Sequence, residues 1–259
     1  SIDDVALARA RAACCSIEDP VTSGKHCAIG GSAYDFYVTS TLASQSPAAV
    51  GRALGFSVAH TNKVDTLFPR NSVSFVSVGD GSTHNAHFLA AVNLSELAIA
   101  HQYRCPVVFC VTNNELCISF KNKGWASKDG TLAKRLEASM EVFRADGNDV
   151  ASLHAAARGA IEKSRKSKKP TVLLVDGVTR RFGHAATDRQ DAYLTQDEID
   201  AAANSSTNLR HIAELCISTG AMTSGEVATR FRELQSTSEE AFAAAVAEPG
   251  ADTIGRQGL

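Results

Sequence analysis

Short apolar runs alternate with helix-length segments through the middle of this chain of 259 residues. The apolar runs cover 73–78, 106–111, 140–144 and 171–175, and the third is the weakest. Strands that alternate with helices form a parallel sheet with helices on both of its faces. We therefore predict an α/β fold with a doubly wound, mostly parallel sheet. Ligands of such sheets bind at the carboxyl ends of the strands.

Residues that start helices mark the segments between these strands. An Ala-rich stretch that follows two acidic residues predicts a first helix. The pair Ser46 and Pro47, and later Asn148, are expected as helix starts. The predicted helices cover 5–15, 46–60, 85–101 and 148–166.

The last quarter of the chain has a different pattern. Thr195 with Glu198, and Thr223 with Glu226, are capping-box pairs that each precede an Ala-rich helix. We therefore predict a ligand-binding domain over 1–190, a C-terminal helical extension over 191–248 and a linker over 249–259.

Composition excludes several classes of partner. The net charge is −2, and no apolar run is long enough to span a bilayer, so we expect neither nucleic acid nor a membrane as partner. Seven scattered cysteines without a C-x-x-C pair predict reduced thiols in an intracellular protein. The first residues lack the features of a signal peptide, and we expect the sequence to be a piece of a longer product.

Polar residues follow the first two predicted strands. Gly79, Asp80 and Gly81 come after the first strand, and Asn113 and Asn114 come after the second. Backbone N–H groups in such a Gly-containing turn can bind a phosphate, and Asp80 can hold a hard cation. Because the ends of parallel strands share one sheet edge, a carboxylate and an amide oxygen should meet there. This donor set suits magnesium. Taken alone, the Gly-Asp-Gly tripeptide is more often a simple turn.

This strand, GDG, helix, strand, NN order is that of the thiamine diphosphate motif. From about residue 20 to 253 the chain resembles the alpha subunits of 2-oxo acid dehydrogenases, the branched-chain and pyruvate dehydrogenase decarboxylating components. It resembles still more the single-chain forms that fuse alpha and beta halves. The matching segments are 23–26, 39–45, 49–51, 79–81, 113–114, 146–149 and 180–188.

The resemblance implies roles for individual residues. Asp80, Asn114 and the carbonyl of Leu116 would bind Mg²⁺. The remaining predicted roles are aminopyrimidine contact for Ser40 and Leu42, diphosphate contact for Gly79, Gly81, Ser82 and Arg180, and a catalytic role near substrate for His184. For His184 the plainer alternative is a loop histidine that caps a backbone group.

The resemblance also implies an activity and its partners. The activity is oxidative decarboxylation of a 2-oxo acid with acyl transfer to lipoamide, as in branched-chain amino acid catabolism. The expected partners are a beta subunit or fused beta half, a lipoyl-bearing acyltransferase and the 2-oxo acid, within an oligomer. The beta half would supply the glutamate that activates the aminopyrimidine, so the isolated chain is predicted to be inactive. The expected location is the mitochondrial matrix in a eukaryote or the cytoplasm in a bacterium.

Some residues depart from the family pattern and keep alternatives open. Thr112 stands where the branched-chain enzymes have an arginine, and Glu115 replaces a glycine and would add negative charge beside the diphosphate. Ala185 replaces the serine that is phosphorylated in the animal pyruvate enzyme. One alternative is a non-catalytic relic or scaffold with the same fold. Another is an alpha subunit of the acetoin dehydrogenase type. His84, His87 and His101 are assigned no role.

Overall fold

The computed structural model describes residues 2–24, 34, 41–185, 187–205 and 207–250. The chain groups into two compact units, one formed by 42–212 and the other by 1–41 together with 213–259. Ser40, the predicted contact of the aminopyrimidine, lies outside the described residues.

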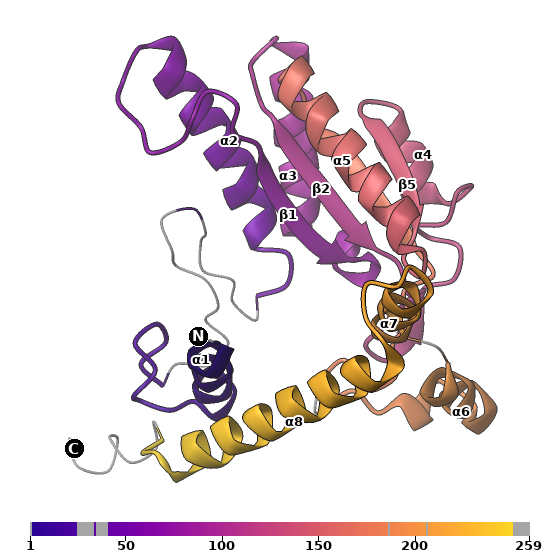
Figure 1. Ribbon diagram of the computed structural model, residues 1–259. Coiled ribbons are helices and arrows are strands. Elements are labelled where there is room, and N and C mark those ends of the chain that lie inside the picture. Colours follow the sequence, from indigo (N-terminus) through magenta and orange to yellow (C-terminus); the bar gives the residue numbers. More distant parts are fainter. Residues whose placement is uncertain (1, 25–33, 35–40, 186, 206, 251–259) are drawn as a thin grey trace, which may run out of the picture. The chain divides into compact units, whose positions relative to one another are not determined.

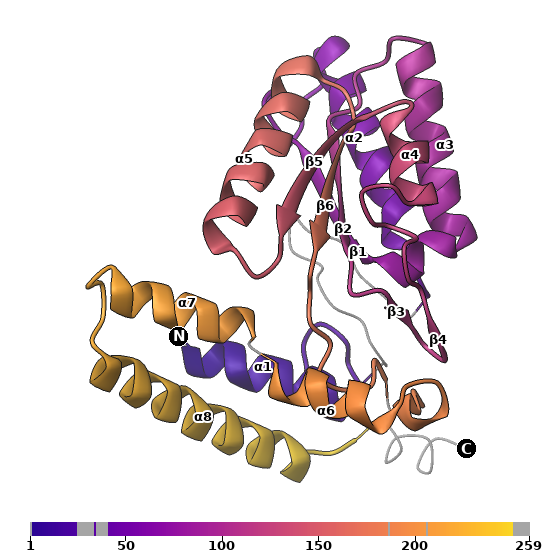
Figure 2. The ribbon, with the colours of Figure 1, turned by 90° about the vertical axis from the view of Figure 1, so that its right-hand side faces the viewer.

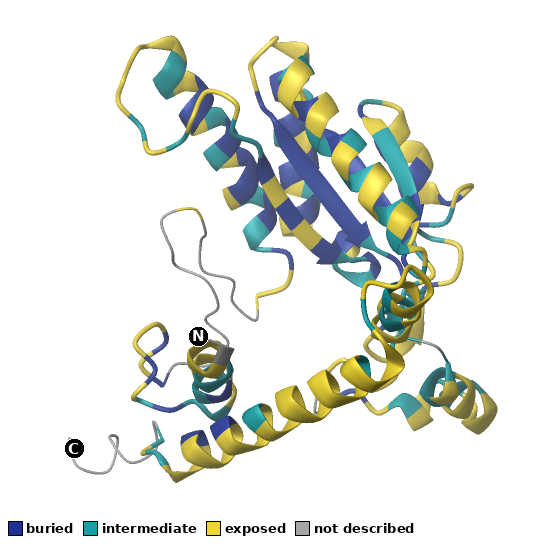
Figure 3. Ribbon diagram, viewed as in Figure 1, coloured by how far each residue is buried: buried dark blue, intermediate teal, exposed yellow. Residues whose placement is uncertain are grey.

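Four parallel strands form the central sheet of the unit 42–212. They are β1 (Ser74–Gly79), β2 (Val107–Thr112), β5 (Glu141–Asp146) and β6 (Thr171–Asp176). Their spatial order is β1-β2-β6-β5, and every pair is parallel. The two central strands are buried along nearly their whole length, and β2 shows this clearly in Figure 3. The predicted parallel sheet is confirmed.

Helices cover both faces of this sheet (Figure 2). On one face α5 (Val150–Ser167) places Ala160 in a cluster with Val108 and Leu173. On the other face Phe88 of α3 (Ala86–Ala100) meets Phe109 edge to face, with ring centroids 5.9 Å apart. The helices α2 (Gln45–Thr61) and α4 (Thr131–Glu137) complete the layers.

Two predicted helix caps are wrong: α2 is capped by Ser44, two residues before Ser46, and α5 by the residue that follows Asn148. The helix α2 begins at Gln45, and the Ser46 hydroxyl is buried with no hydrogen-bond partner in the described part of the chain, so Ser46 is not the cap. The helix α5 is capped by Asp149, whose carboxylate accepts the N–H groups of Ala151 and Ser152 at 3.0 Å each. The Asn148 amide instead donates to the Gly177 carbonyl at 2.8 Å.

Both capping boxes predicted in the tail are formed. Thr195 starts α6 (Gln196–Asn204), and Thr223 starts α8 (Ser224–Ala247). In each, the threonine side chain accepts the N–H of the glutamate three residues later, and that glutamate accepts the threonine N–H. The extension is therefore helical, as predicted, and α7 (Asn208–Ser218) joins these two helices.

Three small elements near the carboxyl ends of the strands were not predicted. The turn η1 (Asp80–His84) is a single 3₁₀ segment after β1. A hairpin of β3 (Leu116–Cys117) and β4 (Phe120–Lys121) follows β2. The short segment η2 (Gln190–Ala192) lies before α6. Because the first two follow the ends of β1 and β2, they shape the edge where a ligand is expected.

In the second unit, α1 (Ile2–Cys14) packs against α8. Ala10, Ala241 and Ala245 form the buried contact, and Arg11 pairs with Glu248 at 2.6 Å. The domain boundaries predicted at residues 190 and 248 rest on the sequence pattern alone. The division of the structure into two units rests on contacts, and these place α1 and α8 in one unit. Among the described residues, no helix combines the length and apolarity that crossing a bilayer requires.

Candidate functional site

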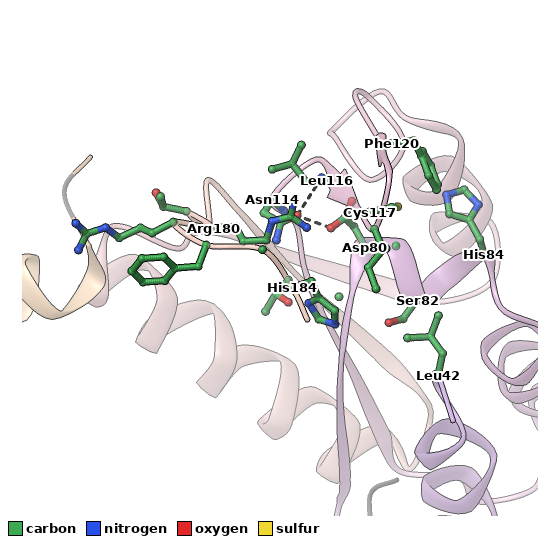
Figure 4. A pocket seen from close by; sticks show the side chains of 18 residues that line it. Leu42, Asp80, Ser82, His84, Asn114, Leu116, Cys117, Phe120, Arg180 and His184 are labelled. Carbon is green, nitrogen blue, oxygen red and sulfur yellow. Dashed lines mark hydrogen bonds between the residues drawn. The ribbon is translucent and has the colours of Figure 1, made fainter. Parts of the chain in front are cut away.

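A cavity of about 690 Å³ opens where β1, β2 and β6 end (Figure 4). All of its lining residues belong to the unit 42–212. They include every predicted site residue in the described part of the chain: Leu42, Gly79, Asp80, Gly81, Ser82, Asn114, Leu116, Arg180 and His184. The rest of the lining is His84, Thr112, Cys117, Ile118, Phe120, Thr179, Arg181, Phe182 and Gly183. That these residues bind a cofactor stays a prediction.

The sheet register brings Asp80 and Asn114 together. Gly79 and Thr112 are paired at the ends of β1 and β2. Beyond this pair, the Asp80 Oδ1 atom accepts the Asn114 N–H at 3.4 Å. The Asn114 Oδ1 atom in turn accepts the Leu116 N–H at 2.9 Å (Figure 4). Hydrogen bonds therefore link the three residues expected to hold Mg²⁺ one to the next, and all three line the cavity.

Asp80 is a buried carboxyl group, with 1% of its surface exposed. Burial raises its pKa above the ordinary value, although hydrogen bonds from Asn122 and Asn114 act in the opposite direction. Desolvation of an ionised carboxylate is costly unless a positive charge lies next to it. A cation bound at Asp80 would supply that charge.

Gly81 lets the β3 strand lie close against the turn η1. A Cβ atom built at Gly81 would be 2.7 Å from the Cys117 Sγ atom, so the thiol would have to move to admit any side chain. Burial, with the nearby Asp80 charge, raises the pKa of the Cys117 thiol to about 11. The thiol is therefore neutral near pH 7, so it does not compete with Asp80 as an anionic ligand.

The loop that follows β6 carries Arg180 and His184 and is organised by Asp188. The Asp188 carboxylate accepts the His184 N–H at 2.8 Å and the Tyr193 hydroxyl at 3.0 Å, and it pairs with Arg180 at 3.3 Å. Arg180 also donates to the Tyr193 oxygen. Burial alone would raise the pKa of Asp188, but these hydrogen bonds and the Arg180 charge outweigh it, so the pKa is lowered.

Arg180 and His184 face the cavity in different ways. The Arg180 side chain is only 10% exposed, and its Nε atom is buried with no hydrogen-bond partner among the described residues. A buried donor without a partner lowers stability unless a ligand accepts its hydrogen bond. The His184 backbone is held by Asp188, while the residue itself is exposed at the cavity wall. Because this hydrogen bond uses only the His184 main chain, the loop is held while the His184 side chain lines the cavity.

Sequence reasoning missed a set of residues that contact Asp80 and its turn. The Asn122 Nδ2 atom donates to Asp80 Oδ2 at 2.7 Å, and the His84 Nε2 atom is 2.9 Å from Asn122 Oδ1. The sequence pattern indicates no role for His84 or for Asn122. No sequence pattern signals these contacts, because Asn122 is 42 positions from Asp80.

Two of the three departures from the family pattern, Thr112 and Glu115, are placed differently. Thr112 lines the cavity, and its hydroxyl donates to the Val78 carbonyl at 3.3 Å. Glu115 has a φ of +58°, in the left-handed region where glycine is favoured. Its carboxylate accepts the Gly124 N–H at 3.1 Å, and Glu115 is not among the residues that line the cavity.

The donor atoms favour a hard cation over a transition metal. No group of three or more His, Cys, Asp or Glu side chains that could hold a metal occurs in the described residues. The donors at the end of β1 and β2 are instead one carboxylate, one amide oxygen and backbone carbonyls. Magnesium binds through one or two carboxylates and takes its other ligands from phosphates and water.

Comparison with known proteins identifies a family and several relatives of this chain. The family model described as "Dehydrogenase E1 component" matches residues 8–253. The chain is 30% identical over 166 residues to the mitochondrial 2-oxoisovalerate dehydrogenase subunit alpha 2 of Arabidopsis thaliana, which covers 64% of this chain and 32% of that protein. It is 32% identical over 165 residues to the 2-oxoisovalerate dehydrogenase subunit alpha of Pseudomonas aeruginosa, covering 63% and 36%.

A third relative is the pyruvate dehydrogenase E1 component subunit alpha of Acholeplasma laidlawii. It is 28% identical over 159 residues, which are 61% of this chain and 41% of that protein. The matched part of the chain thus spans about a third of the length of these curated relatives. Since the family model covers nearly the whole chain, the chain belongs to the dehydrogenase E1 component family.

Proposed function

We propose that this chain is the diphosphate-binding half of a thiamine diphosphate and magnesium-dependent 2-oxo acid dehydrogenase. The observation that carries the proposal is the contact between Asp80 and Asn114 at the ends of two neighbouring strands. Asp80, Asn114 and the Leu116 carbonyl would hold Mg²⁺, and diphosphate oxygens would complete an octahedron.

The residues around this donor set fit a diphosphate. Gly79 carries no side chain, and no atom lies within 4 Å of a Cβ atom built there, so a diphosphate could approach the backbone of this turn closely. Arg180 adds a planar fork of donors suited to two phosphate oxygens. Its unpartnered Nε atom is one donor available for that purpose. The buried Asp80 carboxylate gains a cation that offsets its desolvation.

When bound, thiamine diphosphate would supply the electron sink that decarboxylation of a 2-oxo acid requires. The chain's own residues would bind and orient. Leu42 lines the cavity, and it would contact the aminopyrimidine and limit the shape of a bound cofactor. The same contact with the aminopyrimidine is proposed for Ser40. His184 would face the substrate and the acyl acceptor, because Asp188 fixes its backbone and leaves its ring at the cavity.

The partners follow from the same proposal. The relatives are named as alpha subunits. We infer that a beta subunit or fused beta half completes the active site and that a lipoyl-bearing acyltransferase receives the acyl group. Within the described chain, no carboxylate other than the buried Asp80 lines the cavity. The isolated chain should therefore bind cofactor but turn over no 2-oxo acid.

Titration calorimetry tests the cofactor site directly. Thiamine diphosphate is titrated into the protein with Mg²⁺ or with EDTA, and binding should need Mg²⁺. Asp80→Ala should weaken binding at least about 100-fold, since even residues that only support a metal ligand are worth roughly 10–100-fold. The matched control is Asp129→Ala, which removes an exposed carboxylate outside the cavity.

Two outcomes would overturn the proposal. Equal binding by Asp80→Ala and the wild type would exclude the Asp80 site. No binding by the wild type, even when a beta half is added, would favour the non-catalytic scaffold. If binding is found, turnover of different substrates by the completed enzyme separates branched-chain 2-oxo acids, pyruvate and acetoin.

A further inference from the structure

The Asp80 carboxylate is held by a residue from the hairpin segment that follows β2. Asn122 is 6% exposed, and its Nδ2 atom lies 2.7 Å from Asp80 Oδ2. Asp80 Oδ1 faces Asn114. Both carboxylate oxygens therefore accept a hydrogen bond, so the plane of the carboxylate is fixed from two sides.

The hydrogen bonds also determine the orientation of the next two side chains. An ionised carboxylate only accepts hydrogen bonds, so the Asn122 group that faces Asp80 must be its NH₂. The Asn122 Oδ1 atom then faces His84 at 2.9 Å and must accept a hydrogen bond. The His84 Nε2 atom consequently carries a proton. Asp80 thus determines the orientation of the Asn122 amide, and Asn122 determines which nitrogen of His84 carries a proton.

A second connection holds the main chain of Asp80. The Thr83 hydroxyl donates to the Asp80 carbonyl at 2.6 Å, and the Trp125 Nε1 atom donates to the Thr83 oxygen at 2.7 Å. The Trp125 ring also stacks on His84, with centroids 4.3 Å apart and an interplanar angle of 29°. The side chain and main chain of Asp80 are thus both anchored to the segment between Asn122 and Trp125.

We infer that Asn122 is a positioning residue that fixes the Asp80 carboxylate for Mg²⁺, and that His84 holds Asn122 in the orientation this requires. The inference rests on the proposed function. Mg²⁺ demands near-ideal octahedral geometry, so a carboxylate fixed from two sides gives a ligand oxygen in a defined direction. Ca²⁺ accepts irregular geometry and should depend less on this support.

The test measures the affinities of Mg²⁺ and of Ca²⁺ for the full chain by calorimetry in saturating thiamine diphosphate. Asn122→Leu keeps the size of the side chain and removes the donor. It should weaken Mg²⁺ binding roughly 10–100-fold and Ca²⁺ binding by less. The change in the ratio of the two affinities is the deciding readout, because a general loss of folded protein would lower both equally.

Substitutions at His84 test whether His84 orients Asn122, and they leave Asp80 and Asn122 themselves unchanged. His84→Phe keeps a ring to stack on Trp125 but removes the donor, and it should shift the same ratio toward Ca²⁺. His84→Gln restores an N–H donor and should return the ratio toward the wild-type value. Asn93→Ala, an exposed asparagine on α3, is the control and should leave both affinities unchanged.

The outcomes separate this inference from the proposed function. If the wild type binds Mg²⁺ with thiamine diphosphate and Asn122→Leu keeps the same ratio of affinities, the positioning role is overturned and the proposed function stands. If His84→Phe and His84→Gln behave alike, the His84 step is overturned. If the wild type binds neither metal, both proposals are overturned.

Discussion

Gly81 and Cys117 approach so closely that a Cβ atom at position 81 would lie 2.7 Å from the Cys117 sulfur. The two residues come from the turn η1 and the strand β3, so this contact brings the hairpin against the end of β1. Both line the cavity. The glycine is therefore favoured here by lack of space, and not by its φ, which lies outside the left-handed region.

Gly81→Ala should destabilise the fold by roughly 1–3 kcal/mol, the usual cost of overpacking a close contact. Cys117→Ala removes the sulfur that the new methyl group would meet, so the double variant should be more stable than the sum of the two single changes predicts. A coupling of about 0.5–3 kcal/mol is typical for residues in contact. Urea unfolding of the four proteins measures it, and strictly additive losses would contradict this account.

Asp188→Asn should reduce stability in a pH-dependent way. The folded pKa of Asp188 is lowered from 3.8 because hydrogen bonds and the Arg180 charge outweigh burial. Asp188 therefore contributes stability above pH 3.8 that is lost as pH falls through the folded pKa. Removing a charged, buried acceptor costs roughly 1–3 kcal/mol. The difference between wild type and variant should be full at pH 6 and shrink below about pH 4.

Urea unfolding at pH 6 and pH 3.5 measures this difference. The control is Asp191→Asn, which removes an exposed carboxylate that pairs with Arg189 on the surface. Surface pairs contribute little, so this variant should leave the free energy of unfolding nearly unchanged at both pH values. A difference between wild type and Asp188→Asn that is the same at both pH values would argue against the assigned hydrogen bonds.

The sheet and the meeting of Asp80 with Asn114 could be predicted because both depend on local pattern and one general rule. Each strand is an apolar run recognisable from its own residues. Once the two runs are parallel neighbours, the residues after each end must share one edge. Arg180 and His184 were predicted at the same place only from the family resemblance, and the structure puts all of these residues around one cavity.

The support around Asp80 could not be predicted in this way. The contact between Asn122 and His84 joins residues 38 positions apart through a two-residue hairpin strand with no periodic pattern. Helix starts failed for a related reason. Asn148 and Asp149 are both good capping residues, and a tertiary hydrogen bond from Asn148 to Gly177 decides which of them caps α5.

Lys168→Gly should stabilise the protein. Lys168 ends α5 with φ +58° and ψ +28°, a left-handed conformation that costs a residue with a side chain about 1 kcal/mol relative to glycine. The gain should be about 0.5–1 kcal/mol, after the greater freedom of glycine in the unfolded chain is counted. Ser167→Gly, one position earlier and inside the helix, should instead lower the free energy of unfolding by up to about 1 kcal/mol. Thermal unfolding distinguishes the two signs.

His184→Ala should separate catalysis from cofactor binding in the enzyme completed by its beta half. The loop is held through the His184 N–H, which alanine retains, so the position of Arg180 should not change. If the imidazole acts in proton transfer, turnover with a lipoyl acceptor should fall about 10²–10⁴-fold. Thiamine diphosphate affinity measured with Mg²⁺ should stay within a few-fold of the wild type. His87→Ala, an exposed histidine on α3 outside the cavity, should change neither quantity. Unchanged turnover in His184→Ala would mean that the histidine only caps its loop.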